Sequence, residues 1–170
     1  MKTLVTLFVV LLIAAALSCS SPDAAQDITG FRGFSWGYKL QKNDSIFTVI
    51  LREEHRACGE RRGENLKIGD ATLSSITYGF GQDKLSYVVI TCEGYWNFRA
   101  LLSATTEKYG AYDQPNEDIL TYYWVMSRGA GALEYNESSE VTKLCFYSKV
   151  MAEEERLFRE NEAKKPKDDF

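Results

Sequence analysis

Short runs of β-branched, aliphatic and aromatic residues recur along this chain and limit it to a small set of folds. They are separated by segments rich in Gly, Asn, Asp and Ser, which favour turns. Runs of this length and composition are typical of strands. The clearest runs cover residues 45–52, 71–80, 85–92, 119–126 and 141–148. The pattern predicts a mainly antiparallel sheet of six or seven strands.

Weaker signals complete the predicted sheet. Residues 31–37 alternate aromatic with small or polar side chains and are predicted as a first strand that ends in a glycine turn. Residues 56–66 are polar and carry charges of both signs, so we predict a ragged edge strand there. Residues 132–135 are predicted as a short strand, and residues 69–70 (Gly-Asp) as a tight turn.

One segment has the period of a helix. In residues 97–109, apolar side chains recur at three- and four-residue steps, and Gly110 follows as a stop signal. The members of the apolar stripe are Phe98, Leu101, Leu102, Thr105 and Tyr109. We predict an amphipathic helix packed across the sheet.

A second, highly charged helix is predicted over residues 151–163. Residues 153–155 are all Glu and are predicted to lie in its first turn, where the helix dipole favours negative charge. Glu155 with Arg159 and Glu160 with Lys164 have the spacing of i,i+4 ion pairs. Residues 164–170 are predicted as a loose tail. The sequence thus predicts an α+β fold, with a mainly antiparallel sheet, one helix across it and a charged C-terminal helix.

The first eighteen residues read as a secretory signal peptide. Lys2 supplies a positive start, and residues 3–17 are apolar apart from two threonines. A spanning helix needs about 20 apolar residues, so this run is too short for a confident anchor. We therefore expect residues 1–18 to be removed and the mature protein to lie outside the cytoplasm.

Cys19 marks the junction between this leader and the mature chain. Residues 16–19 (Ala-Leu-Ser-Cys) resemble the lipobox of bacterial lipoproteins, although Leu17 stands one position late. The resemblance implies lipidation at Cys19, with residues 19–27 as a polar tether. Because Ser20 follows, it also implies the periplasmic face of the outer membrane. The alternative is cleavage after Ser18 or Ala25, which leaves a soluble periplasmic protein.

Composition limits the partners of the mature chain. The full chain has 45% apolar and 13% aromatic residues, enough for a single core, which we place in residues 28–150. The formal charge of −4 provides no basic footprint for nucleic acid. We expect the membrane as a partner through the N-terminal lipid, with another envelope protein or a cell-wall glycan as further candidates.

Three cysteines remain after Cys19. An oxidising compartment allows one disulfide and a free thiol, or three free thiols. Cys92 and Cys145 lie in apolar stretches, where free cysteine often packs as a small hydrophobic residue. A disulfide between these two is the favoured pairing, and Cys58 then remains free.

No catalytic, cofactor or metal site is assigned from the sequence. His55 is the only histidine, and no Gly-x-Ser-x-Gly elbow accompanies it. His55 and Cys58 form a single H-x-x-C, which with Cys92 and Cys145 has the composition of a zinc site but not its usual paired spacing. An envelope hydrolase that uses Glu carboxylates and His55 is kept as an alternative function.

Aromatic residues offer the other candidate surface. Tyr122 and Trp124 share one face of a predicted strand, while Tyr123 points to the opposite face. Together with Trp96 and Tyr109, Tyr122 and Trp124 form a predicted aromatic surface for glycan, peptide or a small apolar ligand between sheet and helix. The alternative is that these side chains pack in the core.

Three motifs resemble those of a group of small uncharacterised exported bacterial proteins of the lipoprotein type. They are the FxGxxWG opening at residues 31–37, the LKIGDA turn at residues 66–71 and the EKYG helix end at residues 107–110. The resemblance spans about residues 31–148 and implies a shared fold without carrying catalytic residues. We therefore expect a lipid-anchored, non-enzymatic binding or interaction module.

Overall fold

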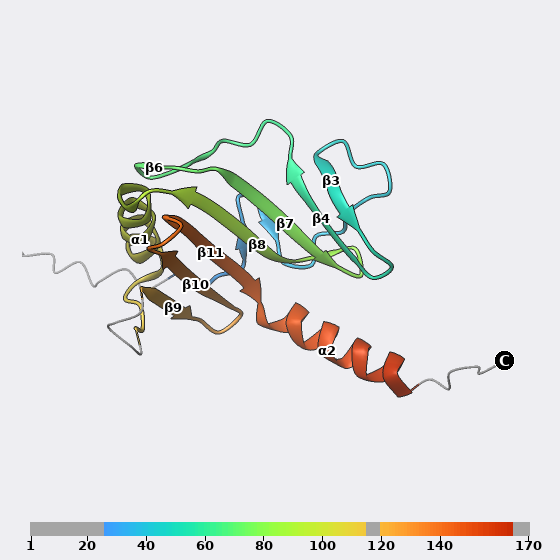
Figure 1. The fold of residues 1–170 in the computed structure, drawn as a ribbon. Helices are drawn as coiled ribbons and strands as arrows, with labels where there is room; N and C mark the ends of the chain where they lie inside the picture. Colours follow the sequence, from blue (N-terminus) through green and yellow to red (C-terminus); the bar gives the residue numbers. More distant parts are fainter. Residues whose placement is uncertain (1–25, 115–119, 165–170) are drawn as a thin grey trace, which may run out of the picture.

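The structure is a computed structural model that describes residues 26–114 and 120–164. Its main strands are β3 (Phe47–Arg52), β4 (Arg56–Arg61), β7 (Ser75–Gly81), β8 (Lys84–Glu93), β9 (Thr121–Val125), β10 (Gly129–Asn136) and β11 (Val141–Ser148). They form one seven-stranded sheet in the order β3-β4-β7-β8-β11-β10-β9, and every neighbouring pair is antiparallel (Figure 1). With one helix across this sheet and a second at the C-terminal end, the predicted α+β fold is confirmed.

Alternation along the central strands decides which face of the sheet is buried. In β8, which lies between β7 and β11, Val88 and Ile90 point to one face of the sheet and are fully buried. Tyr87 of the same strand points to the opposite face. The register pairs Ile90 with Leu144 of β11, which is also buried, so the inner side chains of neighbouring strands form one core. A one-residue slip would bring all of them to the opposite face.

Helix α1 (Tyr95–Tyr109) covers the inner face at one end of the sheet (Figure 1). Its buried residues are the ones that the helical spacing predicted: Phe98, Leu101, Leu102, Thr105 and Tyr109. Gly110 ends the helix with φ of 85° and donates its N–H to the Thr106 carbonyl. The predicted helix and its stop are therefore confirmed, with a start two residues earlier.

Two short ribbons flank the sheet instead of joining it. They are β1 (Gly30–Phe31) with β2 (Phe34–Ser35), and β5 (Lys67–Ile68) with β6 (Ala71–Thr72). The single strand predicted over residues 31–37 is wrong, because the chain reverses at Arg32 and Gly33, both of which have positive φ. The tight turn predicted at residues 69–70 is confirmed, and Gly69 has φ of 54° there.

A partly buried ionic network joins these ribbons to the sheet. Arg32 donates to Glu64 Oε1 at 2.7 Å, to the Lys67 carbonyl at 2.5 Å and to the Asn65 carbonyl. The Tyr78 hydroxyl donates to the other oxygen of Glu64 at 2.5 Å. Burial alone would raise the pKa of Glu64, but the hydrogen bonds from Tyr78 and Arg32 outweigh it and lower the pKa. The β1–β2 hairpin is thereby fixed over the inner face of the sheet.

The edges of the sheet differ from the prediction. β4 was predicted as an edge strand, but it lies between β3 and β7, so that prediction is wrong. Its polarity reflects alternation, since Ala57 and Gly59 point inward and Arg56 points outward. The true edges are β3 and β9, and β3 carries three half-exposed apolar residues, Val49, Ile50 and Leu51.

Helix α2 (Lys149–Lys164) follows β11 directly and extends beyond the sheet (Figure 1). Because it begins at Lys149, its first turn contains no acidic residue, and the prediction that Glu153 to Glu155 lie in that turn is wrong. The Ser148 hydroxyl instead accepts the Met151 N–H at 3.2 Å. No residue of α2 is buried, in contrast to α1.

Candidate functional site

The outer face of the sheet is left uncovered by α1 and the ribbons. Tyr87, Tyr123 and Tyr147 point to this face from β8, β9 and β11, and each is more than one-third exposed. Val125 at the β9 edge is more exposed still. Solvent-facing strands usually carry polar residues at outward positions, so these aromatic positions set this face apart.

Tyr87 lies at the centre of the outer face, where a glycine makes room for it. A Cβ atom built at Gly79, its partner on β7, would lie 2.0 Å from the Tyr87 ring, so the ring rests on the glycine backbone. Burial raises the pKa of Tyr87, and nearby Cys58 raises it further. The tyrosine is thus held flat on the sheet with one side open to a partner.

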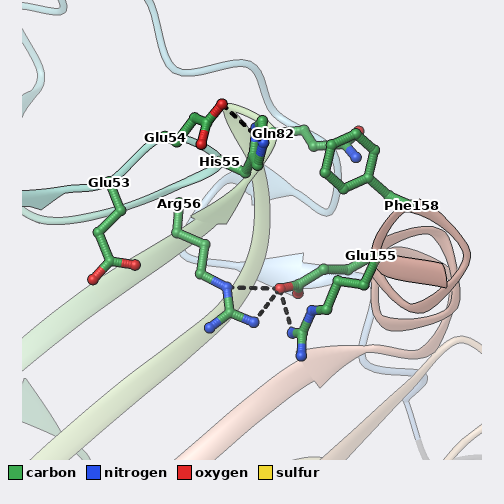
Figure 2. Close-up of a pocket in the computed structure, with 8 residues that line it drawn as sticks. Glu53, Glu54, His55, Arg56, Gln82, Glu155 and Phe158 are labelled. Carbon is green, nitrogen blue, oxygen red and sulfur yellow. Dashed lines mark hydrogen bonds and ion pairs between the residues drawn. The ribbon is translucent and has the colours of Figure 1, made fainter. Parts of the chain in front are cut away.

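A second candidate lies where α2 meets the β3–β4 turn. A cavity of about 350 Å³ opens there, and Figure 2 shows the side chains around it. The lining residues are Glu53, Glu54, His55, Arg56, Gln82, Glu155, Phe158 and Arg159. It brings together the histidine and several of the carboxylates that the hydrolase alternative invoked.

Glu155 is the centre of this cluster. One of its oxygens accepts hydrogen bonds from Arg56 Nε at 2.8 Å, from Arg56 Nη2 at 2.5 Å and from Arg159 Nη2 at 2.5 Å (Figure 2). Burial would raise the pKa of Glu155, but the bonds from Arg159 and Arg56 dominate and lower it. The carboxylate is therefore held ionised, which suits an ion-pair clamp and not a general acid.

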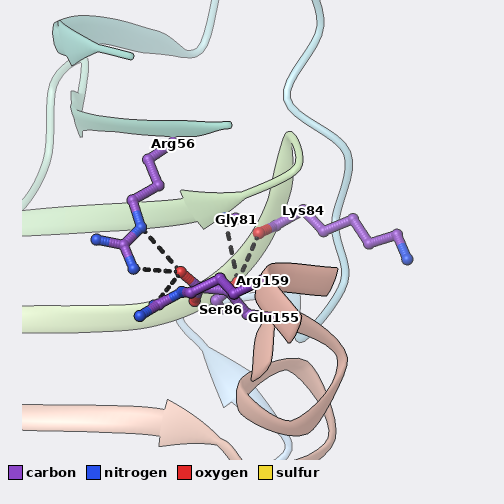
Figure 3. Close-up of polar contacts among 6 residues, drawn as sticks. All are labelled: Arg56, Gly81, Lys84, Ser86, Glu155 and Arg159. Atoms are coloured by element: carbon purple, nitrogen blue, oxygen red, sulfur yellow. Dashed lines mark hydrogen bonds and ion pairs between the residues drawn. The ribbon is translucent and has the colours of Figure 1, made fainter. Parts of the chain in front are cut away.

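Residues at the β7–β8 turn support this ion-pair cluster. Figure 3 shows the Ser86 hydroxyl donating to the Lys84 carbonyl at 2.9 Å and accepting the Gly81 N–H at 3.2 Å. Lys84 Nζ reaches Glu154 at 2.8 Å, and a Cβ atom at Gly81 would lie 3.6 Å from Glu155. These contacts hold α2 against the end of the sheet, so the cluster has a structural explanation.

His55 has no catalytic arrangement within the described residues. Its ring packs edge-on against Phe158 with centroids 4.8 Å apart, and its Nε2 lies 3.5 Å from Glu54. Glu53 and Glu54 are exposed, and no hydroxyl or thiol nucleophile lines the cavity. The residues named for a hydrolase thus come together without a nucleophile or a buried acid.

The favoured disulfide does not form. Cys92 lies opposite Thr142 with its side chain in the core, whereas Cys145 lies opposite Val89 on the outer face. All three described cysteines are free, and burial raises the pKa of both Cys92 and Cys145. The period of two places the members of the favoured pair on opposite faces of the sheet, which prevents the bond.

The four aromatic residues predicted as one surface are separated by the structure. Tyr109, Tyr122 and Trp124 are buried in the core, and Trp124 Nε1 donates to the Gly110 carbonyl at 3.0 Å. Trp96 is 84% exposed near the start of α1. Tyr122 and Trp124 do share one face, as the alternation indicated, but it is the inner face covered by α1.

Other predictions concern parts of the chain or of the chemistry that the structure leaves open. The predicted signal peptide and Cys19 lie outside the described residues, as do residues 165–170 of the predicted tail, whereas Lys164 is the last residue of α2. Across residues 26–114 and 120–164, no cluster of three His, Cys, Asp or Glu side chains has the geometry to hold a metal ion. Among the same residues, no helix is both long and apolar enough to cross a bilayer.

Sequence reasoning found the strands but not the importance of the outer face. The sequence does contain outward aromatic residues in β8 and β11, namely Tyr87 and Tyr147. The register shows that both lie on the same face of the sheet as Tyr123. Comparison of the chain with known families, with curated proteins and with solved structures finds no match. The candidate functions therefore have to be argued from the geometry alone.

Proposed function

We propose that this chain is an exported, lipid-tethered envelope protein that binds a partner protein through the outer face of its sheet and has no catalytic activity of its own. The observation that carries the proposal is an uncharged, tyrosine-rich row that crosses six strands. Its members are cross-strand neighbours in the register: Cys58, Gly79, Tyr87, Tyr147, Ala130 and Val125.

A second row lies directly beside the first and has the same character. It consists of Thr77, Val89, Cys145, Ala132 and Tyr123. Charged residues stand at the margins of the two rows, with Arg56 and Glu60 on β4, Glu134 on β10 and Lys143 on β11. An uncharged centre enriched in Tyr with a charged rim is the composition of protein–protein interfaces.

The charges of the rim favour a protein over a membrane surface as the partner. A face that lies on anionic lipid needs a cluster of Lys and Arg, whereas this rim carries both signs. Mixed charges fix the orientation and register of a protein partner more than they add affinity. The proposal therefore commits to another protein of the envelope.

The proposed tether is compatible with this role. The described chain is anchored at Asp27, which accepts hydrogen bonds from the Ser127 hydroxyl and the Arg128 N–H. The eight residues from Cys19 to Gln26 span at most about 26–29 Å when fully extended. A lipid on Cys19 would thus keep the domain close to the membrane with the β9–β10 turn nearest to it.

Site-specific photo-crosslinking in intact cells tests the proposed surface. A photoreactive amino acid at position 123 should give a discrete adduct with one partner, because Tyr123 lies on the outer face. The matched control is position 112, because Tyr112 is 40% exposed and Tyr123 is 38% exposed. Tyr112 differs in that it packs against Tyr122 and Trp124, which belong to the inner face. Tyr147→Glu should abolish the adduct by burying a charge in the interface. Equal adducts at both positions, or none at position 123, would contradict the proposal.

The tether is tested separately by the mass of the mature protein isolated from a bacterial host. We expect a chain that begins at Cys19 and carries acyl groups. Cys19→Ser should yield a protein without acyl groups that is no longer recovered with membranes. A mature chain that retains Met1 would refute both the export and the tether.

A further inference from the structure

A cavity of about 280 Å³ lies between the C-terminal half of α1, the two ribbons and strand β11. Its walls are formed by Phe31, Arg32, Lys67, Ile68, Ala104, Thr105, Lys108, Tyr109, Leu144 and Phe146. It is on the inner side of the sheet, so it is separate from the outer face proposed to bind a protein. Ligand pockets in proteins start at roughly this size.

The deep wall of the cavity is apolar and part of the core. Phe31, Leu144 and Phe146 are buried and belong to the main hydrophobic cluster, with Ile68 packed against it. Phe31 and Phe146 are in ring contact at 6.1 Å, and Tyr109 packs on Phe146 at 5.2 Å. Such a wall binds an aliphatic or aromatic group by removing it from water.

The mouth of the cavity carries more positive than negative charge. Among the five cavities compared within the described residues, this one alone is lined by basic side chains and no acidic one. Arg32 is neutralised by Glu64. Lys67 and Lys108 make no ion pair with any described residue, and Lys108 Nζ lies 5.2 Å from the centre of the Tyr109 ring. On a chain with a net charge of −4, two unpaired lysines at one cavity favour an anionic ligand.

Tyr109 supplies a hydroxyl group to the wall of the cavity. No hydrogen bond joins this hydroxyl to another described residue, and it is not among their fully buried, unpaired polar atoms. The hydroxyl is therefore accessible, although the residue as a whole is only 4% exposed. The neighbouring Thr105 hydroxyl is already used, because it donates to the Leu101 carbonyl at 2.7 Å. Tyr109 is thus the hydroxyl that can donate to a ligand in the cavity.

We propose that this cavity binds a small amphipathic carboxylate, with its apolar tail against Phe31, Leu144 and Phe146 and its carboxylate at Lys67 and Lys108. The Tyr109 hydroxyl donates a hydrogen bond to the ligand. Since a water molecule occupies about 30 Å³ in the liquid, the cavity holds roughly nine or ten non-hydrogen atoms. Octanoate, an eight-carbon acid, has this size. The inference does not depend on the proposed protein partner.

Isothermal titration of the purified protein with octanoate tests this inference. We expect saturable one-to-one binding, with octanol and octylamine, which have the same tail but no anionic head, bound at least ten-fold more weakly. Phenylacetate is titrated in the same way as an aromatic acid. Binding of either acid supports the site, and the acid with the higher affinity shows whether the cavity prefers an aliphatic or an aromatic tail. Equal binding of acid, alcohol and amine, or no saturable binding of either acid, would overturn the inference.

Variants then locate the binding. The double variant Lys67→Gln with Lys108→Gln should weaken octanoate binding at least ten-fold, and Tyr109→Phe should weaken it about two- to ten-fold, the range for one lost hydrogen bond. Lys42→Gln is the matched control, because Lys42 is exposed and does not line the cavity. Ala104→Met fills the cavity from α1 and should abolish binding while the protein stays folded by circular dichroism. Unchanged binding in folded Ala104→Met and in the lysine double variant would place the ligand elsewhere and refute the inference.

Discussion

The two helices of this protein follow central strands in the same way but are held by different forces. α1 leaves β8 and buries five side chains against the sheet, whereas α2 leaves β11 and buries none. α2 is fixed by ion pairs from Glu154 and Glu155 to the sheet and by the ring contact of Phe158 with His55. α1 is thus part of the core, and α2 is an appendage held mainly by electrostatics.

The cavity beside each helix shows the same contrast. At α2 both arginines are already paired, because Arg56 and Arg159 are bound to Glu155, while the other carboxylates of the cavity, Glu53 and Glu54, are exposed. At α1 the wall is apolar, and Lys67 and Lys108 have no acidic partner in the cavity. The cavity at α2 therefore has no unpaired arginine for an anionic ligand, whereas the cavity at α1 has two unpaired lysines. What decides anion binding is whether the basic groups are already satisfied.

The sharpest test of the comparison makes the same change in both helices. Leu101 in α1 is fully buried, whereas Leu157 in α2 is 46% exposed. Leu101→Ala should cost about 2–5 kcal/mol, because it removes buried apolar atoms and leaves a cavity. Leu157→Ala should cost no more than about 0.5 kcal/mol. Urea unfolding of both variants checks the difference. Similar losses would show that α2 is part of the core after all.

A second test removes the partly buried charge that fixes the β1–β2 hairpin next to α1. Glu64→Gln leaves Arg32 without its anionic partner and weakens the bond from Tyr78. We expect a loss of about 1.5–3 kcal/mol, the range for hydrogen bonds to charged groups. Glu60→Gln, four residues away at an exposed position of β4, is the control and should be nearly neutral. A neutral Glu64→Gln would mean that apolar contacts alone hold the hairpin.

The same carboxylate makes stability depend on pH. Hydrogen bonds from Tyr78 and Arg32 outweigh the effect of burial and lower the pKa of Glu64 below its ordinary value of 4.5. The stabilisation it provides is therefore complete above that value and is lost as the pH falls through the lower folded pKa. The stability gap between the unmodified protein and Glu64→Gln should shrink between about pH 5 and pH 3. Urea unfolding at several pH values measures it, and a constant gap would contradict the assignment.

Local patterns predicted much of the fold. The strands β8, β9 and β11 and both helices were predicted because period and turn residues are properties of the nearby sequence. The single strand predicted over residues 71–80 is correct only for β7, because residues 71–72 form β6 in a separate ribbon. The errors arose where distant residues decide. Polar β4 was predicted at an edge, although β3 covers it, and residues 31–37 were predicted as one strand, although Arg32 and Glu64 fix a hairpin there.

The candidate sites were harder to predict than the fold, because they depend on which face of each strand is covered. Tyr109, Tyr122 and Trp124 resemble surface aromatics by type and spacing, yet all three are buried where α1, which includes Tyr109, packs on the sheet. The separation of Cys92 from Cys145 likewise follows from register, which pairs Cys92 with Thr142. No property of either segment alone contains that information.

The smallest expected effect concerns the attachment of α2 itself. Glu155→Gln weakens its bonds to Arg56 and Arg159, which are more than half exposed, so global stability should fall by only about 0.2–1 kcal/mol. The local effect should be larger, with faster amide hydrogen exchange along α2 and unchanged exchange in α1. Glu153→Gln is the control, because Glu153 pairs with Arg156 inside the same helix and not with the sheet. Equal acceleration of exchange in both variants would mean that ion pairs within α2 stabilise the helix. The bond between Glu155 and Arg56 of the sheet would then not be what attaches α2.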